Sequence, residues 1–247
     1  MEKGRKVLGA GKGASFWVGT SGYSYREWKP AFYPVDLPSA QMLSFYGRQF
    51  PTVEINSSFY RAPTAKMLQG WADSVPGNFL FSFKAPQTIT HIKRLKGVQA
   101  EVEDFLEATS SLEGRLGCLL FQLPPYQKLD LPLLKKFLPL VRHARCAFEF
   151  RHPSWFEETV IETLRDSGVA LCFNDADVSD CPFSPTAKHG YLRLRKVNYK
   201  PAEIQSWAKR LAQMHWASSF VYFKHEDSAS APRLALSLLK KLDGSES

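Results

Sequence analysis

The feature that most constrains this chain is a series of eight short runs of apolar, β-branched and aromatic residues, spaced fairly evenly along it. The runs span residues 16–20, 52–56, 79–84, 116–122, 145–150, 169–174, 191–195 and 220–224. Most are apolar almost throughout rather than alternating, which is typical of parallel strands whose two faces are both covered. The pattern therefore predicts a largely parallel, fully buried sheet.

Helical patterns separate these runs. They span residues 39–50, 64–74, 98–112, 131–141, 154–167, 201–215 and 231–242. The fifth is expected to start at an N-cap, Ser154, and to end just before Gly168. The connection between the sixth and seventh runs contains Pro182 and Pro185, and we expect it to lack a full helix.

Eight strands alternating with seven helices in 247 residues predict an α/β fold, a (β/α)8 TIM barrel with the sixth helix missing or degenerate. The main alternative is an open doubly wound sheet, which is disfavoured because no phosphate-binding glycine fingerprint follows the first strand. Residues 16–247 are expected to form a single barrel domain, preceded by a flexible basic arm of residues 1–15.

The charge of the chain predicts an anionic partner. Its 32 Lys and Arg residues against 24 Asp and Glu residues give a formal net charge of +8. A charge of this size favours binding of an anionic small molecule or of nucleic acid. The arm carries part of this charge, since four of its residues are basic and one is acidic.

The location of the protein is predicted from what the chain lacks. No apolar run approaches the roughly 18 residues of a membrane span, so no membrane partner is expected, and the arm has no apolar core of a secretory signal. The four cysteines contain no C-x-x-C pair, which favours buried free thiols over a zinc or redox site. We expect a cytoplasmic protein, and its oligomeric state stays open.

Polar and aromatic residues gather where the predicted strands end, which is where TIM barrels place their sites. The candidate ligand-binding residues are Tyr23, Tyr25, Trp28, Tyr60, Arg61, Lys84, His91, Gln122, Arg151, His152, Asp175, Arg193 and Arg195. The aromatic rings of the first loop are suited to stacking on bases or on a sugar. They are equally suited to closing the barrel mouth as an apolar lid, which we expect for most of them.

Glu54 and Glu149 each interrupt an otherwise apolar strand and are the candidate catalytic residues. A carboxylate that points into a barrel needs a cation, because an unpaired buried charge costs several kcal/mol. The candidate partners are Lys84, Arg151, Arg193 and Arg195. Either the two carboxylates act as acid, base or substrate anchors, or they belong to an ion-pair network that only fixes the barrel interior.

Arg193 and Arg195 share one face of their strand by period-two alternation. Lys84 and Arg151 end other strands on the same rim, and planar guanidinium groups suit phosphate or carboxylate. These residues predict an anion site. The alternative is that one arginine pairs with Glu149 and the other faces the helices or solvent.

Possible metal ligands are spaced poorly. His152, Asp175, Asp177, His225, Glu226 and Asp227 supply the right residue types, but no H-x-H or H-E-x-x-H spacing is present. We therefore predict no cofactor and assign no metal ligand, with a divalent metal as the less favoured alternative.

Six ordered strings carry a resemblance to a known family: GTSGYSYREWKPAFYP, TVEINSSFYRAP, FSFKAPQTITH, LLFQLPP, FEFRHPSW and YLRLR. They closely resemble the successive motifs of the YecE-like family, a domain of unknown function that forms a TIM barrel. The resemblance spans nearly all of residues 16–242 and implies this fold and a shared pocket, but no settled activity. Nucleic-acid binding is suggested for the family only by analogy with endonuclease IV-like barrels.

The chain departs from the family pattern in two places. After YLRL the family often has His-Gly, where this chain has Arg195 and Lys196. At the eighth strand it often has Phe-Asn-Asn, where this chain has Phe223, Lys224 and His225. The resemblance therefore assigns no role to these positions here.

Three functions are compatible with these patterns. The first is a pocket that binds a phosphate-bearing ligand, including nucleic acid, with catalysis unproven. The second is a carboxylate-pair hydrolase that acts on a sugar through Glu54 and Glu149. The third is a non-catalytic binding barrel. If the protein is an enzyme, we expect it to hydrolyse a phosphoester or a glycoside.

Overall fold

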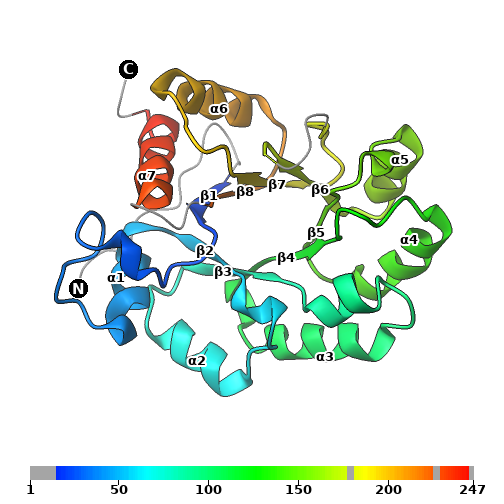
Figure 1. Ribbon diagram of the computed structural model, residues 1–247, viewed down its shortest axis with the longest axis horizontal. Coiled ribbons are helices and arrows are strands. Elements are labelled where there is room, and N and C mark those ends of the chain that lie inside the picture. Colours follow the sequence, from blue (N-terminus) through cyan, green and yellow to red (C-terminus); the bar gives the residue numbers. More distant parts are fainter. Residues whose placement is uncertain (1–14, 177–180, 225–228, 245–247) are drawn as a thin grey trace.

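Eight parallel strands form the centre of the protein. The computed structural model describes residues 15–176, 181–224 and 229–244. The strands are β1 (Ser15–Thr20), β2 (Thr52–Ile55), β3 (Leu80–Lys84), β4 (Leu116–Gln122), β5 (Cys146–Glu149), β6 (Ala170–Asn174), β7 (His189–Leu194) and β8 (Ser218–Phe223). They pair in the order β1-β8-β7-β6-β5-β4-β3-β2, and a parallel bridge between Ser21 and Glu54 joins the two ends (Figure 1). The predicted TIM barrel is confirmed.

Helices surround the strands on the outside (Figure 1). They are α1 (Met42–Gln49), α2 (Ala65–Asp73), α3 (Gln99–Ser110), α4 (Leu131–Phe137), α5 (Glu158–Asp166), α6 (Pro201–Gln213) and α7 (Ser230–Leu242). Short helical turns lie at Arg26–Trp28, Ser39–Gln41, Ser57–Phe59, Thr88–Ile92, Glu113–Arg115, Leu138–Val141 and Pro153–Trp155. The connection from β6 to β7 contains no helix in its described residues, 175–176 and 181–188, as predicted. No helix in the described part of the chain is long and apolar enough to cross a membrane.

The start of the fifth helix differs from its prediction. Pro153–Trp155 forms a separate helical turn, in which the His152 ring accepts the Ser154 N–H at 3.2 Å, and α5 begins only at Glu158. Ser154 is therefore not the N-cap of α5. Packing accounts for the separate turn, because the buried Trp155 ring stacks on Phe150 at 4.4 Å and its Nε1 donates to the Gln127 carbonyl oxygen at 2.7 Å.

The barrel interior has an apolar part that is followed by a polar layer. The buried apolar cluster contains Leu80, Cys118, Leu120, Ala147, Ala170, Cys172, Tyr191, Phe220 and Tyr222. The Tyr222 hydroxyl lies 2.8 Å from both Thr52 and Ser82, on strands that do not neighbour its own, so these side chains meet across the interior. Because strand side chains alternate, the positions two residues further along face inward as well: Glu54, Lys84, Gln122, Glu149, Asn174 and Arg193.

The cysteines are free, as predicted. Cys118, Cys146 and Cys172 are buried on β4, β5 and β6, and Cys181 is half-buried. Burial raises the pKa of all four thiols, so they stay protonated at neutral pH and behave as small apolar groups.

The seam between β1 and β2 is held by a side chain from α1. The Tyr46 hydroxyl accepts the Thr20 N–H at 2.8 Å and donates to the Thr52 carbonyl oxygen at 3.1 Å. Gly19 allows this close approach, because a Cβ there would overlap the Thr52 carbonyl oxygen. The closure of the barrel therefore depends on a glycine in the strand opposite Thr52.

We expect Gly19→Ala to destabilise the protein, because overpacking a close contact costs about 1–3 kcal/mol. The matched control is Gly70→Ala, on the exposed side of α2, where an added Cβ meets nothing within 4 Å. Alanine is the better helix former, so this change is expected to stabilise by about 0.5–1 kcal/mol. Urea unfolding measures both, and an equal effect of the two substitutions contradicts the proposed closure.

Candidate functional site

A cavity of about 450 Å³ opens at the C-terminal ends of the strands. Its lining residues are Tyr25, Asn56, Ser57, Phe59, Tyr60, Lys84, Gln122, Arg151, Arg193, Arg195 and Lys224. Among these described residues five are cations and none is a carboxylate. The site therefore lies where a TIM barrel normally places its function, and its walls are basic.

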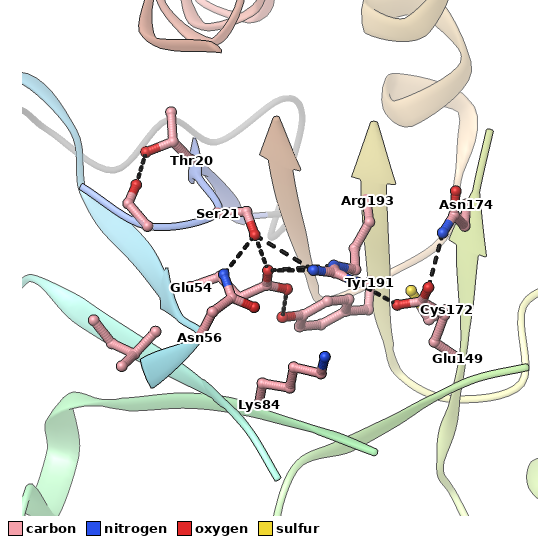
Figure 2. A network of polar contacts seen from close by, with 12 residues as sticks. Thr20, Ser21, Glu54, Asn56, Lys84, Glu149, Cys172, Asn174, Tyr191 and Arg193 are labelled. Carbon is pink, nitrogen blue, oxygen red and sulfur yellow. Dashed lines mark hydrogen bonds and ion pairs between the residues drawn. The ribbon is translucent and has the colours of Figure 1, made fainter. Parts of the chain in front are cut away.

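The floor of the cavity is organised by Arg193, whose side chain is 2% exposed. Its Nη2 donates to Glu54 Oε1 at 3.0 Å, and its Nη1 donates to Glu149 Oε2 at 2.6 Å (Figure 2). Both carboxylates are fully buried. One guanidinium on β7 thus bridges a carboxylate on β2 and another on β5. Arg193, one of the four cations predicted to pair with Glu54 or Glu149, contacts both glutamates.

Glu54 has two further donors. The Tyr191 hydroxyl donates to its Oε2 at 2.6 Å, and the Ser21 hydroxyl donates to its Oε1. Asn56 in turn donates to Ser21 at 2.7 Å (Figure 2). These bonds hold the carboxylate in one orientation.

A second cation, Arg151, and the Asn174 amide also contact Glu149. Arg151 Nε lies 3.2 Å from its Oε1, and Asn174 Nδ2 donates to the same oxygen at 2.8 Å. Burial by itself would raise the pKa of Glu149, but the Arg193 and Arg151 guanidinium groups outweigh it and hold the pKa well below its usual range. Glu149 is therefore a permanent anion at neutral pH.

Lys84 differs from the other cations of the cavity. Its Nζ lies 3.8 Å from the centre of the Phe59 ring, and it has no hydrogen bond or ion pair to a carboxylate in the described part of the chain. Figure 2 shows the side chain pointing toward the network, with no contact drawn to it. Burial, with the Arg193 charge next in size, lowers the pKa of Lys84 to about 8, although Glu149 and Glu54 oppose this.

Gln122 faces Glu149 across the pair of strands β4 and β5. Its side chain is 3% exposed and lines the cavity. The Gln122 side chain is also among the groups that lower the pKa of Glu149, after the Arg193 and Arg151 charges. Gln122 therefore links the lining of the cavity to the buried network.

A second, smaller cavity of about 210 Å³ adjoins the first. It is lined by Gly22, Tyr23, Ser24, Tyr25, Ile55, Asn56, Ser57 and Trp71. Tyr25, Asn56 and Ser57 line both cavities, so the two share one wall. The basic cavity thus lies beside a space with aromatic walls.

The structure brings seven of the thirteen predicted ligand-binding residues to the basic cavity. They are Tyr25, Tyr60, Lys84, Gln122, Arg151, Arg193 and Arg195. Arg193 and Arg195 reach the same cavity, as their period-two spacing predicted, but Arg193 points into the network below it. Neither Glu54 nor Glu149 is among the lining residues.

The other six lie elsewhere. Tyr23 lines only the smaller cavity, and Arg61 is exposed outside both. Trp28 is fully buried against Tyr25 and Tyr33, which is the lid packing expected for most rings of this loop. The remaining three are His91, His152 and Asp175, and none of them lines either cavity.

These three residues support the walls. His91 packs edge-on against Phe59 at 4.8 Å, and burial lowers its pKa to about 4, so the ring is neutral at pH 7. His152 caps the turn before α5. Asp175 accepts the backbone N–H of Arg195 at 2.6 Å, which fixes the residue that follows β7.

Ser21, Asn56 and Tyr191 were not predicted as site residues. Each belongs to the inward-facing set, because Ser21 lies two residues after Gly19, Asn56 two after Glu54, and Tyr191 two before Arg193. The sequence signal that could have identified them is the period-two alternation of strand side chains, counted from the inward-facing residues.

A metal site finds no support in the described residues, which contain no group of three His, Cys, Asp or Glu side chains able to hold an ion. Of the six possible ligands, only His152 and Asp175 are described. Asp177, His225, Glu226 and Asp227 lie outside the described residues, as does all of the predicted arm except Ser15, which opens β1.

The chain is similar to proteins of one family in both sequence and fold. The model of the family described as "Protein of unknown function DUF72" matches residues 17–247. The UPF0759 protein YecE of Escherichia coli K12 is 28% identical over 231 residues, covering 81% of this chain and 85% of YecE. The UPF0759 protein YunF of Bacillus subtilis is 24% identical, covering 92% and 94%. A crystal structure of a DUF72 family protein from Thermotoga maritima superimposes with a TM-score of 0.80 at 25% identity, covering 92% and 99%.

We expect acid to unfold the protein partly through Glu149. Its folded-state pKa lies below the unfolded value of about 4.3. Below that pH the unfolded chain binds a proton that the folded chain does not, so the free energy of unfolding falls as pH decreases, by up to about 1.4 kcal/mol per pH unit. Glu149→Gln removes this contribution, so the free energy of unfolding should depend less on pH. It also lowers stability at pH 7, since breaking a buried ion pair costs about 3–5 kcal/mol.

The measurement is urea unfolding between pH 2.5 and pH 7. The control is Glu162→Gln on α5, an exposed position that forms no ion pair with a described residue. Its free energy of unfolding should change with pH as that of the unsubstituted protein does. If Glu149→Gln leaves the slope unchanged as well, Glu149 is not held ionised by Arg193.

Proposed function

Because the chain belongs to the DUF72 family, whose description assigns no activity, we propose a function from the site: the cavity at the barrel mouth binds a small ligand that carries a phosphate group. One observation carries this proposal. Five cations line a cavity of about 450 Å³ that has no carboxylate in its described lining. The size is within the range of small-molecule sites, about 300–1,000 Å³.

The arginines of the lining support a phosphate group as part of the ligand. Below the cavity, Glu54 and Glu149 pair with Arg193, and Glu149 also contacts Arg151. Neither carboxylate lines the cavity, whereas Arg151, Arg193 and Arg195 do. The planar guanidinium group suits two phosphate oxygens at once.

The aromatic residues of the cavity walls favour a ligand whose remaining part, beyond the phosphate group, is flat or apolar. Tyr60 is 76% exposed at the rim, next to Phe59, and the aromatic second cavity shares a wall with the basic one. A phosphate held by the cations would leave the rest of the molecule beside these rings. This arrangement favours a compact ligand, such as a sugar phosphate or nucleotide, over an extended nucleic-acid strand.

The geometry argues against the carboxylate-pair hydrolase. A glycosidase needs one carboxylic acid with a raised pKa to protonate the leaving group. Here both glutamates are buried beneath the cavity and paired with Arg193, and the pKa of Glu149 is lowered rather than raised. Glu54 and Glu149 are better explained as the ion-pair network that fixes the floor. A non-catalytic binding barrel is compatible with the proposal.

We expect inorganic phosphate to bind the protein and Arg195→Ala to weaken this binding at least about ten-fold. A hydrogen bond to a charged group contributes about 1.5–3 kcal/mol, and 1.4 kcal/mol is a factor of ten. Asp175 contacts the backbone of residue 195, so that contact survives the substitution. Titration calorimetry measures the affinity, with Lys136→Ala on the exposed side of α4 as the control.

The salt dependence separates a single phosphate from a nucleic acid. Each phosphate contact contributes about −0.7 to the slope of log K against log salt for a single strand. A slope of several units for a single-stranded oligonucleotide, with no binding of free phosphate, contradicts the compact-ligand proposal. Equal phosphate affinities of Arg195→Ala and Lys136→Ala contradict the site itself.

We expect Tyr60→Ala to weaken the binding of a nucleoside monophosphate while leaving the binding of inorganic phosphate nearly unchanged. Stacking of a base on an aromatic side chain contributes about 1–3 kcal/mol. Tyr126→Ala is a close control, because this tyrosine is also exposed, at 64%, and does not line the cavity. The same loss in both variants, or in neither, excludes Tyr60 as a stacking platform.

A further inference from the structure

Lys84 combines three properties that the proposed binding role does not require. Its amine lines the cavity, its nearest described contact is the face of an aromatic ring, and no described carboxylate binds it. Its backbone is fixed, because the Lys84 carbonyl oxygen accepts a hydrogen bond from Ser58 at 2.7 Å at the end of β3. A phosphate site needs only its positive charge, which an exposed lysine also supplies.

The surroundings of Lys84 lower its pKa and so raise the neutral fraction of the amine. Burial and the Arg193 and Arg151 charges act in one direction, and Glu149 and Glu54 in the other, and the resulting pKa is about 8. At pH 7 roughly a tenth of Lys84 is then neutral, about 200-fold more than for a lysine with the ordinary pKa of about 10.4. A desolvated lysine next to other cations is a typical activated amine nucleophile. His91, which packs edge-on against Phe59, is uncharged at this pH.

We propose that Lys84 is a catalytic residue whose Nζ forms an imine with an aldehyde or ketone group of the phosphate-bearing ligand. The inference rests on the proposed function, because the neighbouring cations hold the phosphate and so bring the carbonyl group to the amine. It also names the ligand class more narrowly, as a phosphorylated carbonyl compound. The same cations that attract the anion keep the amine partly neutral.

The step balances without an oxidant or reductant. The Nζ lone pair attacks the carbonyl carbon, and the new C–N bond gives a carbinolamine. The two hydrogens of the neutral amine then leave with the carbonyl oxygen as one molecule of water, and a C=N bond remains. Protonation of the imine nitrogen makes the adjacent carbon an electron acceptor, which is the usual purpose of a lysine imine in catalysis.

The test uses pyridoxal 5′-phosphate as a probe, because it carries both a phosphate and an aldehyde. The full-length protein is mixed with an equimolar amount at pH 7, reduced with borohydride to trap the imine, digested and mapped by mass spectrometry. We expect the label chiefly on Lys84, suppressed by excess inorganic phosphate and much weaker with pyridoxal, which lacks the phosphate. The labelling rate should rise with pH to a plateau above pH 8.

Two variants complete the test. Lys84→Arg keeps the charge but has no primary amine, so it should still bind phosphate and lose the main label. Lys136→Arg should label as the unsubstituted protein does. Mapping of the unsubstituted protein needs no variant, so the proposal stays testable even if Lys84→Arg fails to fold.

The outcomes separate this proposal from the one on which it rests. Label spread evenly over exposed lysines, in a protein that binds phosphate, overturns the role of Lys84 and leaves the anion site intact. Equal labelling of Lys84 by pyridoxal and its phosphate, without protection by phosphate, supports a reactive amine and contradicts the anion site. Neither phosphate binding nor preferential label overturns both.

Discussion

The bridge from Arg193 to Glu54 and Glu149 is the interaction on which the rest of the site depends. Three charges are buried in one layer of a barrel interior, where an unpaired ion costs several kcal/mol. They come from β7, β2 and β5, so the pairing links strands that are not neighbours in the sheet. Any shift of one of these strands would leave a charge without its partner. The network therefore fixes the position of the strand ends that carry the cavity.

This network also sets the electrostatics of the cavity. The Glu54 and Glu149 carboxylates form ion pairs with Arg193 below the floor of the cavity, and neither residue lines the cavity. The described lining of the cavity therefore contains five cations and no carboxylate. Burial and the nearby Arg193 charge lower the pKa of Lys84, yet its amine is bound to neither glutamate. A basic cavity with a partly neutral amine follows from this separation.

The aromatic residues complete the arrangement in two ways. Trp28, Tyr33 and their neighbours pack into the core and hold the first loop, while Phe59 and Tyr60 stay at the cavity. Tyr25 takes part in both, because it packs on Trp28, donates to the Ser21 carbonyl oxygen at 3.0 Å and lines the wall between the two cavities. The position of that wall is thereby tied to the same layer as Glu54.

The sequence was sufficient for the fold and for the list of unusual residues. The eight apolar runs, the two prolines between the sixth and seventh runs and the two glutamates inside apolar strands are all local patterns, since alternation along a strand involves neighbours two residues apart. Local patterns also placed Arg193 and Arg195 at one cavity. They failed at Ser154, where the packing of Trp155 decides how α5 begins.

The choice of partners required the tertiary structure. Glu54 had four candidate cations, and its ion pair is with Arg193, 139 residues away, while Ser21, Asn56 and Tyr191 complete its shell. Such contacts depend on how far each strand is displaced along the barrel axis. That displacement depends on every loop and helix between the strands. The same is true of Lys84, whose lack of a carboxylate partner among the described residues follows from where Arg193 directs both glutamates. Strand periodicity is local, whereas the pairing of charges across a barrel is a property of the closed structure.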